Sequence, residues 1–360
     1  MHDEICRRRL AGQFLTTAGP QRGADVVRAL GAMQAQDYGG AKWAVAQRTT
    51  GRTDDEIEAE LETGQILRTH LLRPTWHFVA PSDIRWMLAL TGPRVSAMMA
   101  PVNRRLELDD RVYRRAYRVF TRALAHGNSL TRSELAGALA RGGIAGASGQ
   151  RLGHLMMQAE LDGVVVSGPR RGKQFTYALL DERAPATPAL PRDEALAELT
   201  RRYYTTRGPA TPHDFSWWSG LTVSDARRGI ALLGSSLERL TFGETDHWIA
   251  ADSPAPPRRA LSARLLPNYD EYFIGFRNRS AIGQRVRATS TVTGGSALIP
   301  HVIVVNGELV GVWRRALEKD RVVVTLEAHT ELTRREVDRV AAEARRFGEF
   351  VGRPVEVRIP

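Results

Sequence analysis

Two glutamines separated by one alanine are the polar residues of this sequence whose spacing best suits joint chemistry. They lie in the segment Met33 to Tyr38, which reads MQAQDY. A glutamine amide offers a carbonyl acceptor and two N–H donors, so a pair can orient a water molecule, hold a sugar or stabilise developing positive charge. Alternation places Gln34 and Gln36 on the same side of an extended segment, whereas one helical turn would separate them by about 200°. We therefore expect this segment to be extended or irregular.

A simpler role for the two glutamines is to cap the neighbouring helix by hydrogen bonding to its frayed end. From the residues alone this capping role is the favoured interpretation. Asp37 adjoins the pair and could act as a base, but in an extended segment it points away from Gln36. We interpret Asp37 as structural.

Common enzyme signatures are absent from the sequence. It has no P-loop, no glycine-rich dinucleotide fingerprint, no His-Glu-x-x-His and no Gly-x-Ser-x-Gly. A single cysteine, Cys6, excludes a disulfide framework and a cysteine-based metal cluster. His70 and His77 flank a proline turn and the other histidines are scattered, so we expect no metal site and no cofactor.

The charge balance favours a polyanionic partner. The formal net charge is +11 and the isoelectric point is near 10.4, and basic side chains that neutralise phosphates gain affinity by releasing counterions. Lysine occurs only at Lys42, Lys173 and Lys319, so the arginine excess can also reflect a GC-rich genome. With no secretory segment and no long apolar span, we expect a cytoplasmic, nucleoid-associated protein without a membrane role.

The clearest predicted unit lies in the middle of the chain. Thr131 and Glu134 form a capping-box pattern, Ser148 can cap the next helix, and a hairpin runs from Val164 to Tyr177. This order is that of a winged helix, whose second helix can enter a major groove while the hairpin touches the DNA backbone. The hairpin turn carries three residues that we expect either to bind DNA or to remain solvated: Arg170, Arg171 and Lys173.

The same order of elements recurs on both sides of this unit. Proline-rich linkers at 185–191 and 254–257 divide the chain. After the first linker, Thr211 and Thr222 open two helices before a hairpin around Gly243, and near the N-terminus two helices precede a hairpin around Arg73-Pro74. The sequence predicts three winged-helix units, at residues 1–108 (with the Gln-x-Gln motif), 109–184 and 190–253.

The last part of the chain, residues 258–360, has a different pattern. Short strands are expected at 274–276, 286–293, 302–305, 309–313 and 322–326, with Asn306-Gly307 as a hairpin turn. Thr333 and Glu336 open a terminal helix. The predicted fold class is therefore α+β: tandem winged-helix units followed by a small C-terminal β-barrel or sheet with a terminal helix.

Four segments, in order along the chain, carry a resemblance to a known family. They are Met33 to Tyr38, Thr69 to Val79, Leu265 to Tyr272 and Asn306 to Trp313. Together they resemble the AlkZ/YcaQ family of DNA glycosylases, which place a Gln-x-Gln or Gln-x-Asp motif on tandem winged helices with a C-terminal β-barrel. The resemblance implies that Gln34 and Gln36 are the catalytic pair. Gln36 stands where the YcaQ branch has aspartate. A glutamine at this position is typical of the AlkZ-like branch.

The activity that this resemblance implies is hydrolysis of the N-glycosidic bond of purines alkylated at N7 or N3, with interstrand crosslinks as a further substrate. An alkylated purine is cationic and already a good leaving group, so its departure leaves an oxocarbenium-like sugar without a strong acid. Lys42 could form a Schiff base with the abasic sugar, but we expect an exposed lysine and a monofunctional glycosylase without lyase activity.

The first hairpin supplies the other expected contacts to the lesion strand. Arg73 and Trp76 are expected to contact phosphate and the strand, and His77 to donate to a phosphate or to Gln36. Core packing is the competing interpretation for Trp76.

Tyr38, Asp270 and Glu271 are candidates for the same cleft. The two acids could instead pair with Arg277 and Arg279, which follow closely in the sequence.

The competing function is a non-catalytic transcription regulator, because winged helices commonly bind DNA without chemistry. A regulator would bind one DNA sequence about 10³-fold or more above random DNA, whereas a repair enzyme would bind duplex DNA without sequence preference and with strong salt dependence. In either case we expect double-stranded DNA as the partner and a monomeric protein.

Overall fold

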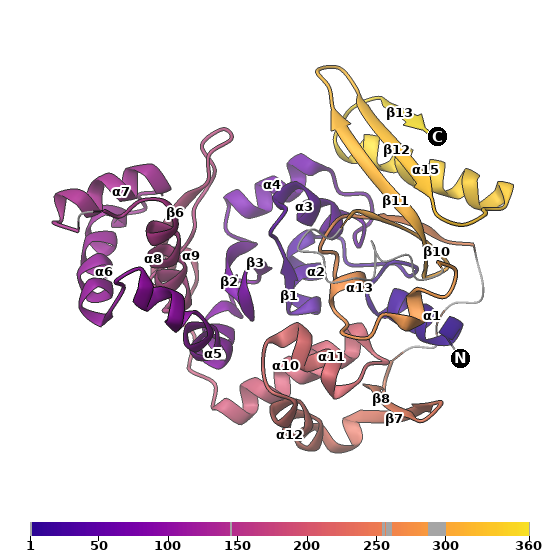
Figure 1. The fold of residues 1–360 in the computed structure, drawn as a ribbon, viewed down its shortest axis with the longest axis horizontal. Helices are drawn as coiled ribbons and strands as arrows, with labels where there is room; N and C mark the ends of the chain where they lie inside the picture. Colours follow the sequence, from indigo (N-terminus) through magenta and orange to yellow (C-terminus); the bar gives the residue numbers. More distant parts are fainter. Residues whose placement is uncertain (1, 145, 254–255, 257–260, 287–299, 360) are drawn as a thin grey trace.

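A computed structural model describes residues 2–144, 146–253, 256, 261–286 and 300–359. The chain is a mixed α+β protein, as expected, and its described strands form four sheets. Figure 1 shows the elements of the first hundred residues in the middle of the molecule, with the later parts of the chain around them.

The first unit carries the glutamine motif. Its elements are α1 (His2–Gly12), α2 (Gly23–Leu30), β1 (Ala32–Gln34), α3 (Tyr38–Ala46), α4 (Asp54–Glu62), β2 (Leu67–Leu71) and β3 (Arg73–Val79). The sheet order is β1-β3-β2, so the short strand that ends in Gln34 pairs with β3, the second strand of the hairpin. This hairpin was predicted around Arg73-Pro74 and is confirmed.

A long helix, α5 (Ile84–Arg105), joins the first unit to the second. The sequence analysis did not predict it, because it contains Pro93 and Pro101, which normally end a helix. The second unit comprises α6 (Asp110–Leu124), β4 (Leu130–Thr131), α7 (Arg132–Arg141), α8 (Gly149–Leu161), β5 (Val165–Ser167), β6 (Thr176–Leu179) and α9 (Leu180–Arg183). Its sheet order is β4-β6-β5, and the predicted capping box of Thr131 with Glu134 is confirmed.

The third unit follows the loop 185–191, which was predicted as a linker. It contains α10 (Arg192–Arg207), α11 (Pro212–Ser219), α12 (Val223–Leu233), the 3₁₀ turn η1 (Gly234–Ser236), and the hairpin β7 (Leu237–Phe242) with β8 (Thr245–Ala250). The predicted caps at Thr211 and Thr222 are both present as capping boxes.

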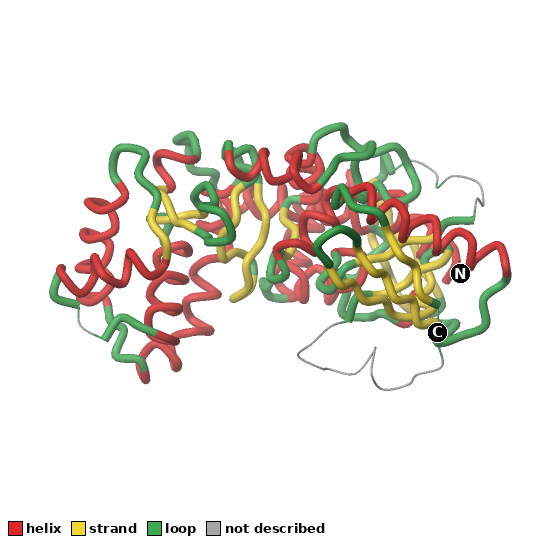
Figure 2. The backbone as a smooth tube through the Cα atoms, turned by 90° about the horizontal axis from the view of Figure 1, so that it is seen from above, coloured by secondary structure: helices red, strands yellow, loops and turns green. Residues whose placement is uncertain are grey.

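The C-terminal part is a five-stranded sheet with a helix beside it. Its elements are β9 (Ala263–Leu266), α13 (Glu271–Ile274), η2 (Ser280–Ile282), β10 (Val302–Val305), β11 (Glu308–Leu317), β12 (Val322–Ala328), α15 (Arg334–Phe350) and β13 (Val355–Arg358). The order is β13-β12-β11-β10-β9, with β13 parallel to β12. Figure 2 shows these strands grouped near the C-terminus with helices beside them.

Two of the predicted C-terminal strands need comment. Residues 274–276 are not a strand, because a short helix capped by Asp270 ends at Ile274. The strand predicted over 286–293 lies, apart from Val286, outside the described residues, as does most of the linker 254–257. The expected capping box of the terminal helix is confirmed by Thr333 and Glu336.

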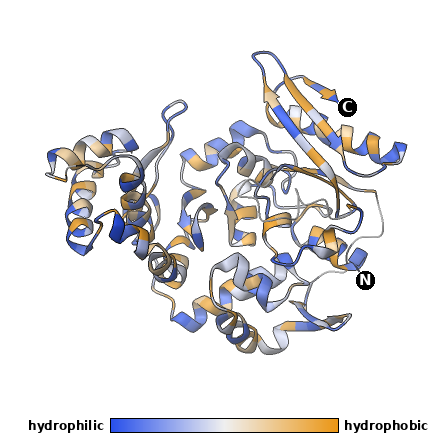
Figure 3. Ribbon diagram, viewed as in Figure 1, coloured by the Kyte–Doolittle hydropathy of each residue, from blue (hydrophilic) through white to orange (hydrophobic). Residues whose placement is uncertain are grey.

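The core of the first unit is shared with distant parts of the chain. Trp43 of α3 packs against Phe347 and Phe350 of α15, with ring centroids 5.3 and 5.1 Å apart, and its Nε1 donates to Leu265 O. In Figure 3, hydrophobic and hydrophilic residues alternate along α15, as expected for a helix with one buried face. Helix α3 of the first unit therefore packs directly against α15 and β9.

Candidate functional site

The two glutamines lie on one side of an extended segment, as the alternation predicted. Gln34 ends β1 opposite His77 of β3, and Ala35 is fully buried between a half-buried Gln34 and an exposed Gln36. Helix α3 is capped by Asp37, whose Oδ1 accepts from Gly40 N at 3.1 Å. The helix-capping interpretation of the glutamines is therefore wrong, and the structural role expected for Asp37 is confirmed.

The backbone of the motif is held from three directions. Gln34 N donates to Glu271 Oε1 at 2.8 Å, and Ala35 N donates to Trp76 O at 2.7 Å. Ala35 O accepts from Arg68 Nε at 3.1 Å. These bonds satisfy the main-chain polar groups around the motif. The two glutamine side chains are then the polar groups of the motif that can face a ligand.

Glu271 is a buried carboxylate beneath the motif. Besides Gln34 N, it accepts from Arg207 Nη2 at 2.7 Å and from Trp218 Nε1 at 2.8 Å. Arg207 also donates to Leu30 O and Ala32 O, at either end of the turn into β1. Because a buried charge is tolerated only when it is paired and hydrogen-bonded, this network fixes the start of the motif.

Asp270 is buried in a second ion pair of the same kind. Arg48 binds both of its carboxylate oxygens at 2.8 Å. The alternative pairing of Asp270 and Glu271 with Arg277 and Arg279 is thus wrong, because their partners are Arg48 and Arg207. Both acids are buried rather than exposed to a cleft, and only Glu271 contacts the motif.

Arg73 orients the side chain of Gln34. Its Nη2 donates to the amide oxygen of Gln34 at 2.8 Å, and its Nη1 donates to Trp217 O at 3.1 Å. A guanidinium can only donate, so the amide atom facing it must be the oxygen. The Gln34 amide nitrogen is left as a donor toward any ligand.

Gln36 is the more accessible of the pair. Its amide oxygen accepts only a long, 3.4 Å bond from Trp76 N. A carbonyl that is exposed and weakly bonded can accept from a water molecule. The pair therefore presents a donor from Gln34 and an acceptor from Gln36.

His77 has a different role from the one predicted. It is fully buried, and its Nδ1 lies 2.9 Å from Thr75 O, so Nδ1 carries the proton. Burial, together with the charge of Arg73, holds the pKa of His77 well below its ordinary value. Its one N–H is engaged with Thr75 O and the ring is buried, so His77 does not donate to a phosphate. Trp76 rather than His77 contacts Gln36.

Trp76 and Tyr38 belong to a cluster of rings and cations beside Gln36. The Arg68 guanidinium lies 4.3 Å from the centre of the Trp76 ring and 5.9 Å from that of Tyr38. The hydroxyl of Tyr38 donates to Glu58 at 2.8 Å, and burial with this carboxylate raises the pKa of Tyr38. Trp76 is half-buried, so part of its ring packs against the protein and part stays accessible.

Lys42 is not the exposed lysine that was expected. Its ammonium is buried between Asp54, at 2.8 Å, and Glu58, at 2.6 Å. This pairing engages the Lys42 amine with both carboxylates.

The three basic residues of the second hairpin are not equivalent. Arg170 packs its guanidinium over Tyr38 and Phe175, while Arg171 pairs with Glu134 at 2.5 Å. Lys173 is exposed at the turn. Only Arg170 lies in the ring cluster near the motif.

Sequence reasoning missed Arg68 and Arg207. Each donates to main-chain oxygens around the motif, but nothing in their immediate sequence distinguishes them from the other arginines. Their role follows only from the strand and helix that carry them.

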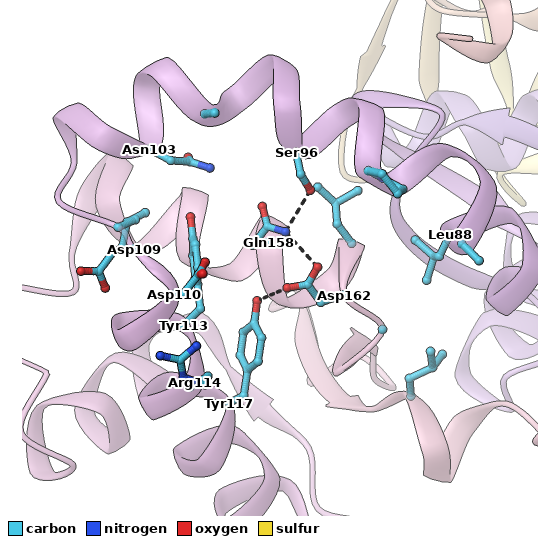
Figure 4. A pocket seen from close by; sticks show the side chains of 18 of the residues that line it. Leu88, Ser96, Asn103, Asp109, Asp110, Tyr113, Arg114, Tyr117, Gln158 and Asp162 are labelled. Atoms are coloured by element: carbon cyan, nitrogen blue, oxygen red, sulfur yellow. Dashed lines mark hydrogen bonds between the residues drawn. The ribbon is translucent and has the colours of Figure 1, made fainter.

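A cavity of about 790 Å³ lies elsewhere, between α5, α6 and α8 (Figure 4). There Asp162 accepts from Tyr117 and Gln158, and no residue of the motif lines it. Among the described residues, no group of three or more His, Cys, Asp and Glu side chains is placed to hold a metal ion. No helix in the described ranges is long and apolar enough to cross a membrane.

Comparisons with known proteins agree over almost the whole chain. A family model described as "DNA glycosylase AlkZ-like" matches residues 27–350. The chain is 26% identical over 364 residues to an interstrand DNA cross-link repair glycosylase of Streptomyces sahachiroi, covering 97% of each protein. The solved structure of the S. sahachiroi DNA glycosylase AlkZ superimposes with a TM-score of 0.82, 25% identity and 99% coverage of both chains. With its glutamine motif, buried anchors and this match, the chain belongs to the AlkZ-like family of DNA glycosylases.

Proposed function

We propose that this protein is a monofunctional glycosylase that removes purines alkylated at N7 or N3 from duplex DNA and also unhooks interstrand crosslinks. The crosslink activity is suggested by the name of its S. sahachiroi relative. The observation that carries the proposal is the arrangement of the two amides. Gln34, at the end of β1, offers a donor fixed by Arg73, and Gln36, in the bend that follows, offers an exposed acceptor.

The proposed reaction breaks the bond between C1′ of the deoxyribose and the alkylated purine. The base takes both electrons of the bond and leaves neutral, because it was cationic before. Water adds to C1′ of the oxocarbenium-like sugar and loses a proton to the solvent. Gln36 Oε1 orients this water, its dipole stabilises the positive sugar, and the Gln34 amide nitrogen holds the sugar or its phosphate. Neutral, undamaged bases react poorly at such a site because it lacks an acid to protonate them.

The three helix–hairpin units act, in this proposal, as tandem winged helices that bind duplex DNA as a monomer without sequence preference. The high positive charge of the chain supports a contact with phosphates. The burial of Lys42 between two carboxylates supports hydrolysis without lyase activity, because its amine is already engaged and is not exposed to an abasic sugar.

Release of N7-methylguanine from methylated duplex DNA tests the proposal. The wild type should release the base, and Gln36→Ala should be slower by about 10² to 10³-fold, which is typical for loss of one catalytic dipole. Gln65→Ala, an exposed glutamine of the same unit, is the matched control and should keep the wild-type rate.

Two outcomes would refute the proposal. One is equal release by the wild type and Gln36→Ala. The other is no release at all together with strong preference for one DNA sequence, which would indicate a transcription regulator. Borohydride trapping on abasic DNA checks the lyase prediction, and a trapped adduct would contradict it.

A further inference from the structure

Two exposed aromatic side chains flank the glutamine motif. Among the described residues, the exposed large hydrophobic side chains include only two aromatic ones, Phe175 (41% exposed) and Trp217 (48%). They come from different units, on the second hairpin and on α11. Each is nonetheless connected through an arginine to the glutamine motif, Trp217 to the Gln34 side chain and Phe175 to the main chain of Ala35.

Trp217 lies beside Gln34. Its carbonyl oxygen and the Gln34 amide oxygen are bonded to the two terminal nitrogens of the same guanidinium, that of Arg73. The indole Nε1 donates to Ile274 O at 3.0 Å, so the orientation of the ring is fixed although half of it is exposed. The next residue, Trp218, is fully buried. Helix α11 can therefore bury one indole, that of Trp218, while it leaves the indole of Trp217 exposed.

The approach of α11 to the hairpin is unusually close. Gly220 ends this helix with a positive φ of 71°, and a Cβ at this position would lie 2.1 Å from Leu72 O. Only glycine lets the helix end meet the β2–β3 turn at this distance. This contact places Trp217 next to Arg73.

Phe175 lies on the Gln36 side of the motif. Its ring packs edge-on to Tyr38 with centroids 5.0 Å apart, and Arg68 lies 4.9 Å from its centre. The same Arg68 guanidinium is over Trp76 and donates to Ala35 O. Phe175 is therefore the exposed end of a stack of rings and cations that reaches the motif itself.

Exposed rings backed by guanidinium groups suit the flat face of a nucleobase. A phosphate contact needs only a positive charge. A base that has lost its stacking neighbour, by contrast, gains binding free energy by stacking on an aromatic ring. Bases must lose such neighbours when a lesion is extruded from the duplex for reaction. Figure 1 shows β1 and β3 lying between the unit that carries β6 and the unit that carries α11.

We propose that Trp217 and Phe175 are stacking platforms that hold unpaired nucleobases of the DNA on either side of Gln34 and Gln36. The site would thus recognise DNA whose bases are unstacked around the lesion rather than a continuous duplex. This inference rests on the proposed function, because it assigns the DNA to the same site.

Binding measurements that do not depend on base release test it. The probes are two duplexes of equal length and sequence, one intact and one with a tetrahydrofuran abasic-site analogue. Trp217→Ala and Phe175→Ala should each weaken binding of the abasic duplex by about 5- to 150-fold, as expected for loss of one stacked base. Binding of the intact duplex should stay within about twofold, because its bases remain stacked on one another.

The conservative variants and a matched control sharpen this test. Trp217→Phe and Phe175→Tyr keep a ring and should retain the preference for the abasic duplex. Leu232→Ala removes a 45% exposed side chain from the same unit as Trp217 and should change neither affinity. The slope of affinity against salt should be the same for all variants, because every basic side chain that can meet a phosphate is kept.

Equal weakening for both duplexes, or no weakening in either alanine variant, would overturn the proposal. Loss of preference in the conservative variants would also overturn it. Failure of the proposed function has a separate signature, since a wild type that releases no methylated base could still distinguish the two duplexes.

Discussion

The first and second units have the same sheet topology but different surroundings. In each, a short strand adds to the second strand of a hairpin, in the orders β1-β3-β2 and β4-β6-β5. Beneath the first sheet lie buried charges from distant parts of the chain, including Arg207 and Glu271. The second unit instead has its own compact core and an outer face rich in exposed arginines.

Under the proposed function, this difference distinguishes the unit that carries the reactive glutamines from the unit that only binds DNA. A hairpin alone does not position the pair of amides, since both units contain a hairpin. The main chain of the first unit is held by Arg207 of α10 and Glu271 of α13, and Trp218 of α11 in turn donates to Glu271. Three predictions test this contrast, beginning with the largest expected effect.

Removing the charge beneath the motif should have the largest effect. Arg207→Met leaves Glu271 buried without its cation, which typically costs about 3–5 kcal/mol of folding free energy. Urea unfolding measures this loss. Arg171→Gln on the second unit breaks an exposed ion pair with Glu134 and should leave the urea midpoint almost unchanged. Similar midpoints for both variants would contradict the contrast between the units.

The arginines of α6 should contribute to DNA affinity rather than to catalysis. Arg111, Arg118 and Arg122 are exposed on the side of α6 opposite its buried face. Replacing all three by glutamine should reduce the slope of log affinity against log salt by about 0.9 for each phosphate that is no longer neutralised. The single-turnover rate at saturating DNA should not change.

The matched control for α6 removes the same charge elsewhere. Replacing three exposed arginines of α15 by glutamine, at Arg334, Arg335 and Arg345, should leave the salt slope closer to the wild-type value. If both triple variants change the slope equally, the effect is one of net charge and not of a defined surface.

The smallest expected effect is a dependence of stability on pH through His77. The unfolded chain takes up a proton on this histidine below its ordinary pKa of 6.5, while the folded protein does not, because the folded pKa is well below that value. The unfolded state then binds more protons, so stability falls as the pH decreases below about 6.5. The loss from His77 alone is about 1.4 kcal/mol at pH 5.5 relative to pH 8.

Urea unfolding of His77→Leu at the two pH values measures this contribution. The variant should lose less stability between pH 8 and 5.5 than the wild type. His213→Gln, at an exposed position of the third unit, should keep the wild-type difference. Every variant keeps part of the dependence of stability on pH through His301, because burial lowers the pKa of His301 to about 4.

Much of the local structure could be predicted from residues close together in the sequence. The capping boxes at Thr131, Thr211, Thr222 and Thr333 and the extended Gln-Ala-Gln segment are examples. Such signals depend on contacts within about four residues and on the alternation of side chains along a strand. Helix α5 was missed because its two prolines oppose the local signal while tertiary packing sustains the helix.

The sequence by itself determined that the two amides would face the same way if their segment was extended, because alternation is a property of an extended backbone. Only the tertiary structure decided what surrounds them. Arg48 meets Asp270 across 222 positions, Arg207 meets Glu271 across 64, and Arg73 joins Trp217 across 144. Among many arginines, the choice of each partner depends on which charge is buried beside which carboxylate or carbonyl. That choice is made when the units pack together, and no short stretch of sequence contains it.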